Sequence, residues 1–293
     1  MSIRDTLALV RIRQWSKNLA VYAAIIFSGE LFDLHALTLV TAGFVAFCLT
    51  ASALYVVNDI LDAERDRRHP LKKNRPIASR RIEPIVAWGI AAALFALGLG
   101  LSVLLGVPFL LTIGAYLVLQ LLYATWLKHA LIVDMLVIGA GFVLRAVAGA
   151  EVISVPVSPW LVICTGLLAL FLAAAKRRHE LVLLEERSSS HRPVLAEYSV
   201  ELLDSFMVTL SAATITTYAL YTFFEVRSPN HTMMLTLPFV IYGLLRYQYL
   251  VLRREGGGRP EDVLLGDRPI IIDVALWIAS AVFVLYALPH FIS

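Results

Sequence analysis

The feature that most constrains this chain is a succession of apolar runs, each close in length to the thickness of a lipid bilayer. An α-helix needs about 20 apolar residues to cross the hydrocarbon core. Nine runs approach that length, near residues 19–32, 36–57, 84–105, 107–126, 130–150, 157–175, 206–224, 232–252 and 270–288. The first run is short, contains Glu30 and follows basic residues, as a signal peptide would. Because eight further runs follow it, we interpret it as a transmembrane helix that is not cleaved off. The sequence therefore predicts an all-α integral membrane protein with nine transmembrane helices, forming one domain over residues 1–293.

The composition excludes a water-soluble globular protein. Of the 293 residues, 59% are apolar and 16% are charged, whereas soluble domains carry about 45–50% apolar and about 25% charged residues. In water such a chain would expose large apolar patches, so lipid must be its solvent. Cys48 and Cys164 lie inside apolar runs without metal-ligand or redox spacing, and we interpret both as core residues.

The distribution of basic residues predicts the orientation of the chain. With the N-terminus inside, 23 of the 25 Lys and Arg residues fall on the inner face, while Arg227 falls outside and Arg145 lies within a span. This asymmetry follows the positive-inside rule and predicts a cytoplasmic N-terminus and an outer C-terminus. Polar sequence gathers in three inner loops, at 58–83, 176–205 and 253–269, the last of which contains the flexible run Gly256–Gly258. We expect the function on this face.

Carboxylates gather where the second predicted span ends. Asn58, Asp59, Asp62 and Asp66 are mostly three or four residues apart, so a continuing helix would place them on one face. The structural alternative is a solvated helix end whose acids pair with neighbouring arginines. Acids that directly follow an apolar span are costly and usually functional. Because oxygen ligands suit Mg²⁺ that is completed by substrate phosphates, we predict a Mg²⁺–diphosphate site here.

Cations follow these acids at once, in the stretch that contains Lys72, Lys73 and Arg75. Lys and Arg side chains bind phosphate oxygens, so acids and cations together suit a metal–diphosphate complex. The alternative role of the basic run is an anchor that fixes membrane topology, and the run can serve both purposes.

The pattern Asn58-Asp59-x-x-Asp62-x-x-x-Asp66 resembles the first signature of the UbiA-type intramembrane prenyltransferase superfamily. Further strings resemble its decaprenyl-phosphate phosphoribosyltransferase branch over nearly the whole chain: Gln14–Asn18, Asp66–Ser79, Tyr123–His129, Leu144–Gly149, Lys176–Leu181 and Asp262–Arg268. The resemblance implies nine transmembrane helices bundled around a central cavity that opens to the cytoplasmic face. It also implies a place in the plasma membrane of a prokaryote and a product that feeds arabinose-containing cell-envelope polymers, with other uses of such a glycolipid left open.

The second inner loop departs from the pattern of many prenyltransferases in the superfamily. Where those carry a second aspartate-rich motif, this chain has Lys176, Arg177 and Arg178, which favour bare phosphate over a second metal. The resemblance implies Mg²⁺-dependent transfer of the 5-phosphoribosyl group from phosphoribosyl pyrophosphate to a polyprenyl (decaprenyl) phosphate, with release of pyrophosphate. The alternative role for these cations is an anchor at the membrane edge.

The resemblance also implies a set of site residues. The implied metal ligands are Asn58, Asp59, Asp62 and Asp66. The implied substrate contacts are Lys17, Tyr55, Lys72, Arg75, Lys128, Arg145, Lys176 and Arg177. No proton-transfer residue is expected, because the acceptor phosphate is already anionic.

Arg145 is the residue of this set whose position is hardest to reconcile with a site at the inner face. It lies fifteen residues into its predicted span, about 22 Å along an ideal helix. An arginine at that depth requires a cavity or a partner. Asp134 is on the same helical face but too distant to pair with it, and a purely structural arginine is the alternative.

Proteins of other functional classes would carry different sequence features. A prenyltransferase with an aromatic acceptor would normally carry a second acidic pair, which this chain lacks. A transporter would place polar groups and broken helices near the membrane midplane, and a non-catalytic scaffold gives no reason for the spaced acids. The expected partners are the two substrates and the membrane, without nucleic acid, and the sequence leaves self-association open.

Overall fold

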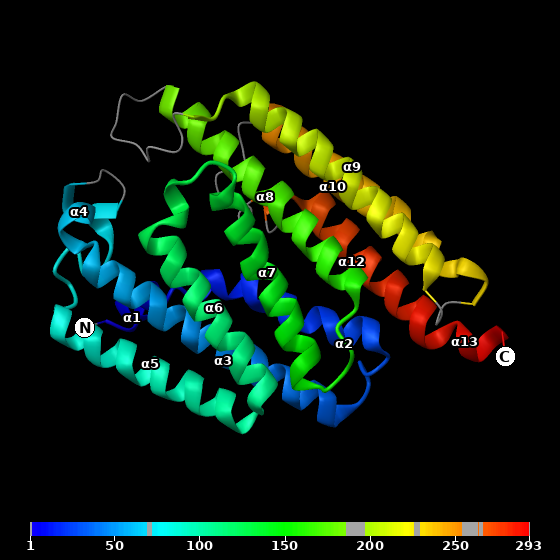
Figure 1. The fold of residues 1–293 in the computed structure, drawn as a ribbon, viewed down its shortest axis with the longest axis horizontal. Helices are drawn as coiled ribbons and strands as arrows, with labels where there is room; N and C mark the ends of the chain where they lie inside the picture. Colours follow the sequence, from blue (N-terminus) through cyan, green and yellow to red (C-terminus); the bar gives the residue numbers. More distant parts are fainter. Residues whose placement is uncertain are drawn as a thin grey trace. The chain divides into compact units, whose positions relative to one another are not determined.

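The computed structural model describes residues 2–68, 72–185, 197–225, 229–253, 263 and 266–292, and the regular secondary structure of these residues is helical throughout (Figure 1). Arg227 and the run Gly256–Gly258 lie outside the described residues. The elements are α1 (Ile3–Val10), η1 (Ile12–Tyr22), α2 (Ala23–Ser28), α3 (Leu34–Leu61), α4 (Ala63–Arg68), η2 (Lys72–Asn74), α5 (Pro84–Leu104), α6 (Val107–Thr125), η3 (Leu127–His129), α7 (Val133–Val152), α8 (Pro159–Glu185), α9 (Val200–Phe224), η5 (Pro229–Thr236), α10 (Leu237–Arg253), α12 (Arg268–Val282), η6 (Phe283–Ala287) and α13 (Pro289–Ile292).

Eight helical stretches of the described chain are long and apolar enough to cross a membrane. They run over Leu34–Leu61, Pro84–Leu104, Val107–Thr125, Val133–Val152, Pro159–Val182, Val200–Phe224, Asn230–Arg253 and Arg268–Ala287. Each coincides with one of the last eight runs predicted from the sequence, and these predictions are confirmed. The physical reason is that the run of apolar residues itself sets the length of a spanning helix.

The first predicted span, at 19–32, does not form a ninth long helix. The 3₁₀ helix η1 ends at Tyr22, and the six-residue helix α2 follows it. Gly29 then adopts φ 90°, a left-handed conformation that ends a helix. The nine-helix count is therefore not confirmed.

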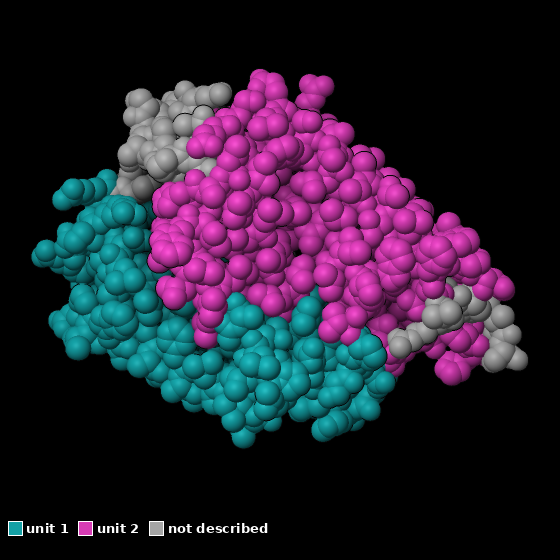
Figure 2. Space-filling model, in the orientation of Figure 1, with its two compact units in different colours: residues 1–25, 30–115, 145–156 teal, residues 26–29, 116–144, 157–293 magenta. Residues whose placement is uncertain are grey.

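The chain divides into two compact units, coloured separately in Figure 2. Unit 1 consists of residues 1–25, 30–115 and 145–156, and unit 2 of residues 26–29, 116–144 and 157–293. Helices α6 and α7 each contribute residues to both units. The two units are described separately below.

Unit 1 is built around α3, which packs along α5 and η1 (Figure 1). Asp33 begins α3 by accepting hydrogen bonds from the backbone N–H groups of residues 35 and 36, at 2.7 and 3.0 Å. Gly98 of α5 lies against Thr50 of α3, where an added Cβ would come within 3.1 Å of the Thr50 backbone nitrogen. The indole of Trp15 donates to Ser52 Oγ at 3.0 Å and ties η1 to α3.

Gly149 of α7 meets the backbone of Val21 in η1, and a Cβ at this position would overlap the Val21 carbonyl. We predict that Gly149→Ala lowers the free energy of unfolding by about 1–3 kcal/mol, because a packed backbone must move to admit the methyl group. Gly100→Ala is the control, since nothing lies within 4 Å of its Cβ position and alanine is the better helix former. Thermal unfolding in detergent measures both variants, and equal stability of the two would contradict the prediction.

Unit 2 contains two apolar clusters. In the first, Phe171 of α8 and Met207 of α9 pack against Tyr247 of α10, with the rings of Phe171 and Tyr247 5.5 Å apart. In the second, Tyr218 of α9 accepts a hydrogen bond from the indole of Trp277 at 2.8 Å. These clusters hold α8, α9, α10 and α12 together by their apolar faces.

Candidate functional site

The acidic motif lies at the end of α3 and in the short helix α4. Asp62 is the residue between the two helices, with φ −89° and ψ 0°. Its backbone N–H donates to the Asn58 carbonyl at 2.9 Å, and the N–H of Asp66 donates to the Asp62 carbonyl at 2.8 Å. Helical hydrogen bonding thus continues through the motif and keeps its four polar residues within about two and a half turns.

Two of the four residues are buried and paired with arginines. The Asp59 carboxylate accepts hydrogen bonds from Arg11 and, at 3.0 Å, from Arg75. Arg75 also donates to Asp66 at 2.7 Å. Only 3% of Asp59 and 2% of Asp66 is exposed. Two negative charges therefore face two positive charges, as buried ionised groups require.

The other two residues of the motif remain accessible. Asn58 is exposed, and 48% of the Asp62 side chain is exposed. Asp62 pairs with Arg65, whose guanidinium is 3.7 Å away. The four residues thus differ from the single accessible stripe expected from their spacing: Asp59 and Asp66 face arginines, while Asn58 and Asp62 face outward. The alternative of acids paired with neighbouring arginines describes part of this region: Asp62 lies near Arg65, and Glu64, between two acids of the motif, pairs with Arg67 at 2.5 Å.

This donor set fits a metal that substrate phosphates complete. Among the described residues, no group of three or more His, Cys, Asp or Glu side chains could hold a metal ion by itself. Mg²⁺, however, commonly binds one or two carboxylates, keeps several waters and takes the remaining ligands from phosphates. Asn58 and Asp62 provide one amide oxygen and one carboxylate on an accessible surface. They are the residues of the motif whose surroundings suit such an ion.

Arg11 is a residue of this site that the sequence reasoning missed. From the sequence it is only one of the 23 Lys and Arg residues expected on the inner face. Besides pairing with Asp59, its guanidinium lies 4.8 Å from the centre of the Tyr55 ring, an arrangement typical of a cation–π contact. Lys17, in the following helix η1, is half-buried and donates to Gln14. No sequence signal distinguished Arg11 from the other basic residues near it.

Arg145 has the partner that its depth requires. It is 4% exposed, and its Nε donates to Asn18 Oδ1 at 2.7 Å. The amide of Asn18 donates in turn to Cys48 Sγ at 3.2 Å, and Arg145 lies 5.9 Å from the centre of the Phe47 ring. The motif Gln14–Asn18 pointed to this region without assigning Asn18 as the partner. Burial and these contacts are what a structural arginine would show.

The other predicted cations of unit 1 follow the acidic motif. Lys72 begins the 3₁₀ turn η2 and is half-buried, and Arg75 is the residue already bonded to Asp59 and Asp66. Residues 69–71 of the string Asp66–Ser79 lie outside the described residues. The structure thus brings Arg75 into contact with the acidic motif, whereas the sequence predicted only that this basic segment binds phosphate oxygens.

Lys128, Lys176 and Arg177 belong to unit 2. Lys128 lies in the turn η3 and Lys176 near the end of α8, and both are half-buried. Arg177 is 1% exposed and pairs with Asp134 at 2.6 Å and Glu180 at 2.6 Å. Neither acid was predicted as its partner; Asp134 was considered only for Arg145.

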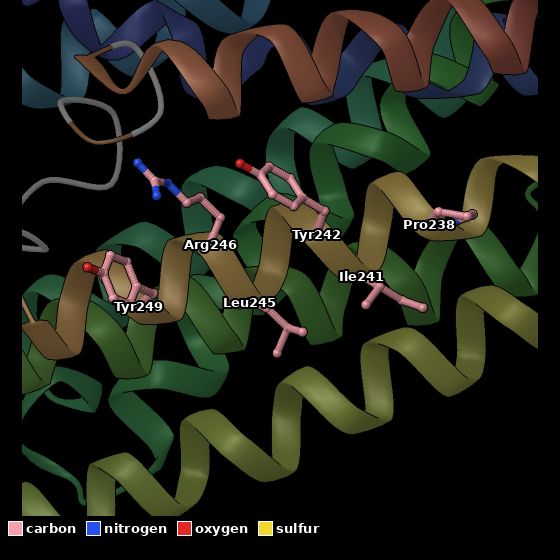
Figure 3. Close-up of a pocket in the computed structure, with 6 residues that line it drawn as sticks. All are labelled: Pro238, Ile241, Tyr242, Leu245, Arg246 and Tyr249. Atoms are coloured by element: carbon pink, nitrogen blue, oxygen red, sulfur yellow. The ribbon is translucent and has the colours of Figure 1, made fainter.

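Unit 2 also carries an open groove of about 570 Å³ along α10, shown in Figure 3. Tyr242, Arg246 and Tyr249 project from one side of the helix, and Leu245 and Ile241 from another (Figure 3). None of the site residues predicted from the sequence lines this groove. Arg246 pairs with Asp267 at 3.0 Å, and Asp267 also begins α12 by accepting from a backbone N–H. Asp267, the last acid of the string Asp262–Arg268, thus caps a helix and pairs with an arginine. Residues 262, 264 and 265 of this string lie outside the described residues.

Comparison with known proteins gives consistent matches along the chain. Residues 19–264 match the UbiA prenyltransferase family. The chain is 34% identical to the decaprenyl-phosphate phosphoribosyltransferase of Corynebacterium glutamicum, over 96% of this chain and 87% of that protein. It is 36% identical to the enzyme of the same name from Mycolicibacterium smegmatis, over 92% of this chain and 89% of that protein.

Solved structures share the fold. A UbiA homologue from Archaeoglobus fulgidus bound to GPP and Mg²⁺ superimposes with a TM-score of 0.72 at 21% identity, covering 96% of this chain and 99% of that one. The same homologue bound to DMAPP and Mg²⁺ gives a TM-score of 0.71 at 20% identity, with the same coverage. At this level of identity the likeness establishes the architecture.

Proposed function

Because this chain belongs to the UbiA prenyltransferase family, a family of multi-pass membrane proteins, we propose that it is a decaprenyl-phosphate phosphoribosyltransferase. The observation that carries the proposal is its 34–36% identity, over more than nine-tenths of its length, to relatives with that activity. The enzyme would transfer the 5-phosphoribosyl group of phosphoribosyl pyrophosphate to a polyprenyl phosphate. An oxygen of the lipid phosphate attacks the anomeric carbon of the ribose, and pyrophosphate leaves.

We propose that Mg²⁺ binds at Asn58 and Asp62, and that Asp59 and Asp66 complete its coordination directly or through water. When bound, the ion would neutralise negative charge on the departing pyrophosphate. Asp59 and Asp66 have a second task that their contacts support, since both hold the guanidinium of Arg75. A fixed cation beside the leaving group stabilises charge without reorganising during the reaction.

The remaining cations are proposed to bind phosphate. Lys17, Tyr55, Lys72, Arg75, Lys128 and Arg145 are the proposed donor contacts, with Arg145 the one whose burial favours a structural task. Lys176 is proposed to contact the 5-phosphate or the lipid phosphate. Arg177 was inferred to share that contact, but its burial between Asp134 and Glu180 favours an indirect contribution. Most of the rate enhancement would come from orientation and electrostatics, because the acceptor needs no strong base.

We further propose that the protein lies in the plasma membrane of a prokaryote with its N-terminus in the cytoplasm, and that residues 1–293 form a single UbiA-type domain. The excess of Lys and Arg on one face supports the orientation. The family match over residues 19–264 runs through both units and supports the single domain.

A direct assay tests the proposal. The purified protein is incubated in detergent with Mg²⁺, labelled phosphoribosyl pyrophosphate and decaprenyl phosphate, and the lipids are then extracted. We expect label in the lipid phase and a product whose mass equals decaprenyl phosphate plus one phosphoribosyl group. Label that stays wholly in the water phase would contradict the proposal, as would transfer of a prenyl group from its diphosphate to an aromatic acceptor.

A further inference from the structure

The guanidinium of Arg177 is a deeply buried charge of unit 2, and protein groups surround it. Its Nε donates to Asp134 Oδ2 and its Nη1 to Glu180 Oε2, both at 2.6 Å, while Nη2 donates to the Tyr123 hydroxyl at 3.1 Å. With 1% of its surface exposed, Arg177 satisfies these acceptors and does not face solvent. A buried arginine in this setting orients its neighbours.

Asp134 extends the network to Tyr198. The Tyr198 hydroxyl donates to Asp134 Oδ1 at 2.8 Å and accepts a hydrogen bond from the backbone N–H of Ile132, also at 2.8 Å. Tyr198 is 5% exposed and Asp134 is fully buried. Burial, the largest cause, raises the pKa of Tyr198, so its hydroxyl keeps its proton at neutral pH and can donate.

The backbone that Tyr198 holds is strained. Ile132 has φ 65°, in the left-handed region that a β-branched side chain rarely adopts. Such a conformation persists where the surroundings impose it. The hydrogen bond from the Ile132 N–H to the Tyr198 hydroxyl is one such constraint, and it fixes the chain just before α7 begins at Val133.

Lys128 lies between the two points that the network holds. Tyr123 contacts Arg177 on one side of it, and Ile132 contacts Tyr198 on the other. The side chain of Lys128 is half-buried, and no hydrogen bond or ion pair to its ammonium group is found within the described part of the chain. A positioned cation without an internal partner suits an external anion.

We infer that Arg177, Asp134 and Tyr198 are positioning residues, which hold the segment 123–132 so that Lys128 meets a phosphate of the donor. This inference rests on the proposed function and adds residues to its machinery. It also gives Arg177 a task that its burial permits, and leaves direct phosphate contact to Lys128 and Lys176.

The variant Tyr198→Phe tests the inference in the full-length protein. It removes the hydroxyl that links Asp134 to Ile132 and keeps the ring. Because Lys128 would contribute to binding before and during transfer, we expect the KM for phosphoribosyl pyrophosphate to rise about tenfold while kcat changes by less than about twofold. Tyr218→Phe is the matched control, since Tyr218 is also buried and bonded, to Thr236 and Trp277, and its kinetics should match the wild type.

A double-mutant cycle separates positioning from general damage. In a Lys128→Ala background, Tyr198→Phe should raise the KM by no more than about twofold, because the group that Tyr198 positions is already absent. A tenfold rise in both backgrounds, or a KM in Tyr198→Phe equal to that of the wild type, would overturn the inference. If Tyr198→Phe does not fold, Tyr123→Phe is measured against the same expectations, since it releases the other end of the segment. A wild-type protein that transfers no label contradicts the proposed function itself.

Discussion

Asp62→Ala is expected to reduce kcat/KM for phosphoribosyl transfer by about 100- to 1,000-fold, the effect of losing one preorganised electrostatic stabiliser of a transition state. Asp62 is the one carboxylate of the motif that is accessible and held only loosely, by Arg65 at 3.7 Å. Asp59 and Asp66 are buried against arginines. Removing Asp62 therefore takes away the acid best placed to bind a metal, without leaving a buried cation unpaired.

The control for this prediction is Glu64→Ala, two residues along the same turn. Glu64 is 80% exposed and pairs with Arg67, and surface pairs of this kind contribute about 0–1 kcal/mol to stability. We expect its activity to be near that of the wild type. A second readout is thermal unfolding with Mg²⁺ and pyrophosphate, which should stabilise the wild type and Glu64→Ala but not Asp62→Ala. Full activity of Asp62→Ala would refute the metal assignment.

Asp134→Ala is expected to lower the free energy of unfolding by about 3–5 kcal/mol, because it leaves part of the buried Arg177 charge without its partner. Asp134 is fully buried and Arg177 is 1% exposed. The same substitution also removes the acceptor of the Tyr198 hydroxyl. Denaturant unfolding in mixed micelles measures the difference from the wild type.

The neighbouring pair provides the control. Arg178 bonds to Asp204 at 2.5 Å, but 13% of the arginine and 35% of the aspartate side chain are exposed. Asp204→Ala should therefore cost about 0–1 kcal/mol, since water replaces part of the lost interaction. Equal losses from Asp134→Ala and Asp204→Ala would show that burial does not decide the contribution of these two pairs. The double variant Asp134→Leu with Arg177→Met should recover most of the lost stability, because apolar groups replace both charges.

The membrane-spanning helices could be predicted from the sequence because each depends on a local property. A run of about 20 apolar residues has few alternatives to a helix in lipid, and eight of the nine predicted runs form such helices within the described chain. The run at 19–32 does not form a spanning helix, because it is short and contains Glu30, and the chain turns at Gly29. Its hydropathy alone could not reveal that Ile12–Tyr22 would form a 3₁₀ helix tied to α3.

The partners of the charged residues could not be predicted in the same way. Arg11 and Asp59 are 48 positions apart, and Arg145 and Asn18 are 127 positions apart. The spacing of Asn58 and the three aspartates along one helix suggested that all four share one face, but helical periodicity describes only neighbours on that helix. The approach of the N-terminal segment and of Arg75 makes Asp59 and Asp66 different from Asn58 and Asp62.

The sequence by itself determined that this chain resides in lipid, where the eight long helices of its described residues run, and which short motif carries acids beside cations. Each of these follows from the order of residues along one segment. Only the tertiary structure decided which of those charges are neutralised internally and which stay accessible. The physical reason is that the free energy of an ion pair depends on burial and on distance to a partner. Arg11 and Arg177 pair with acids from distant parts of the chain, and buried Arg145 donates to the neutral amide of the distant Asn18.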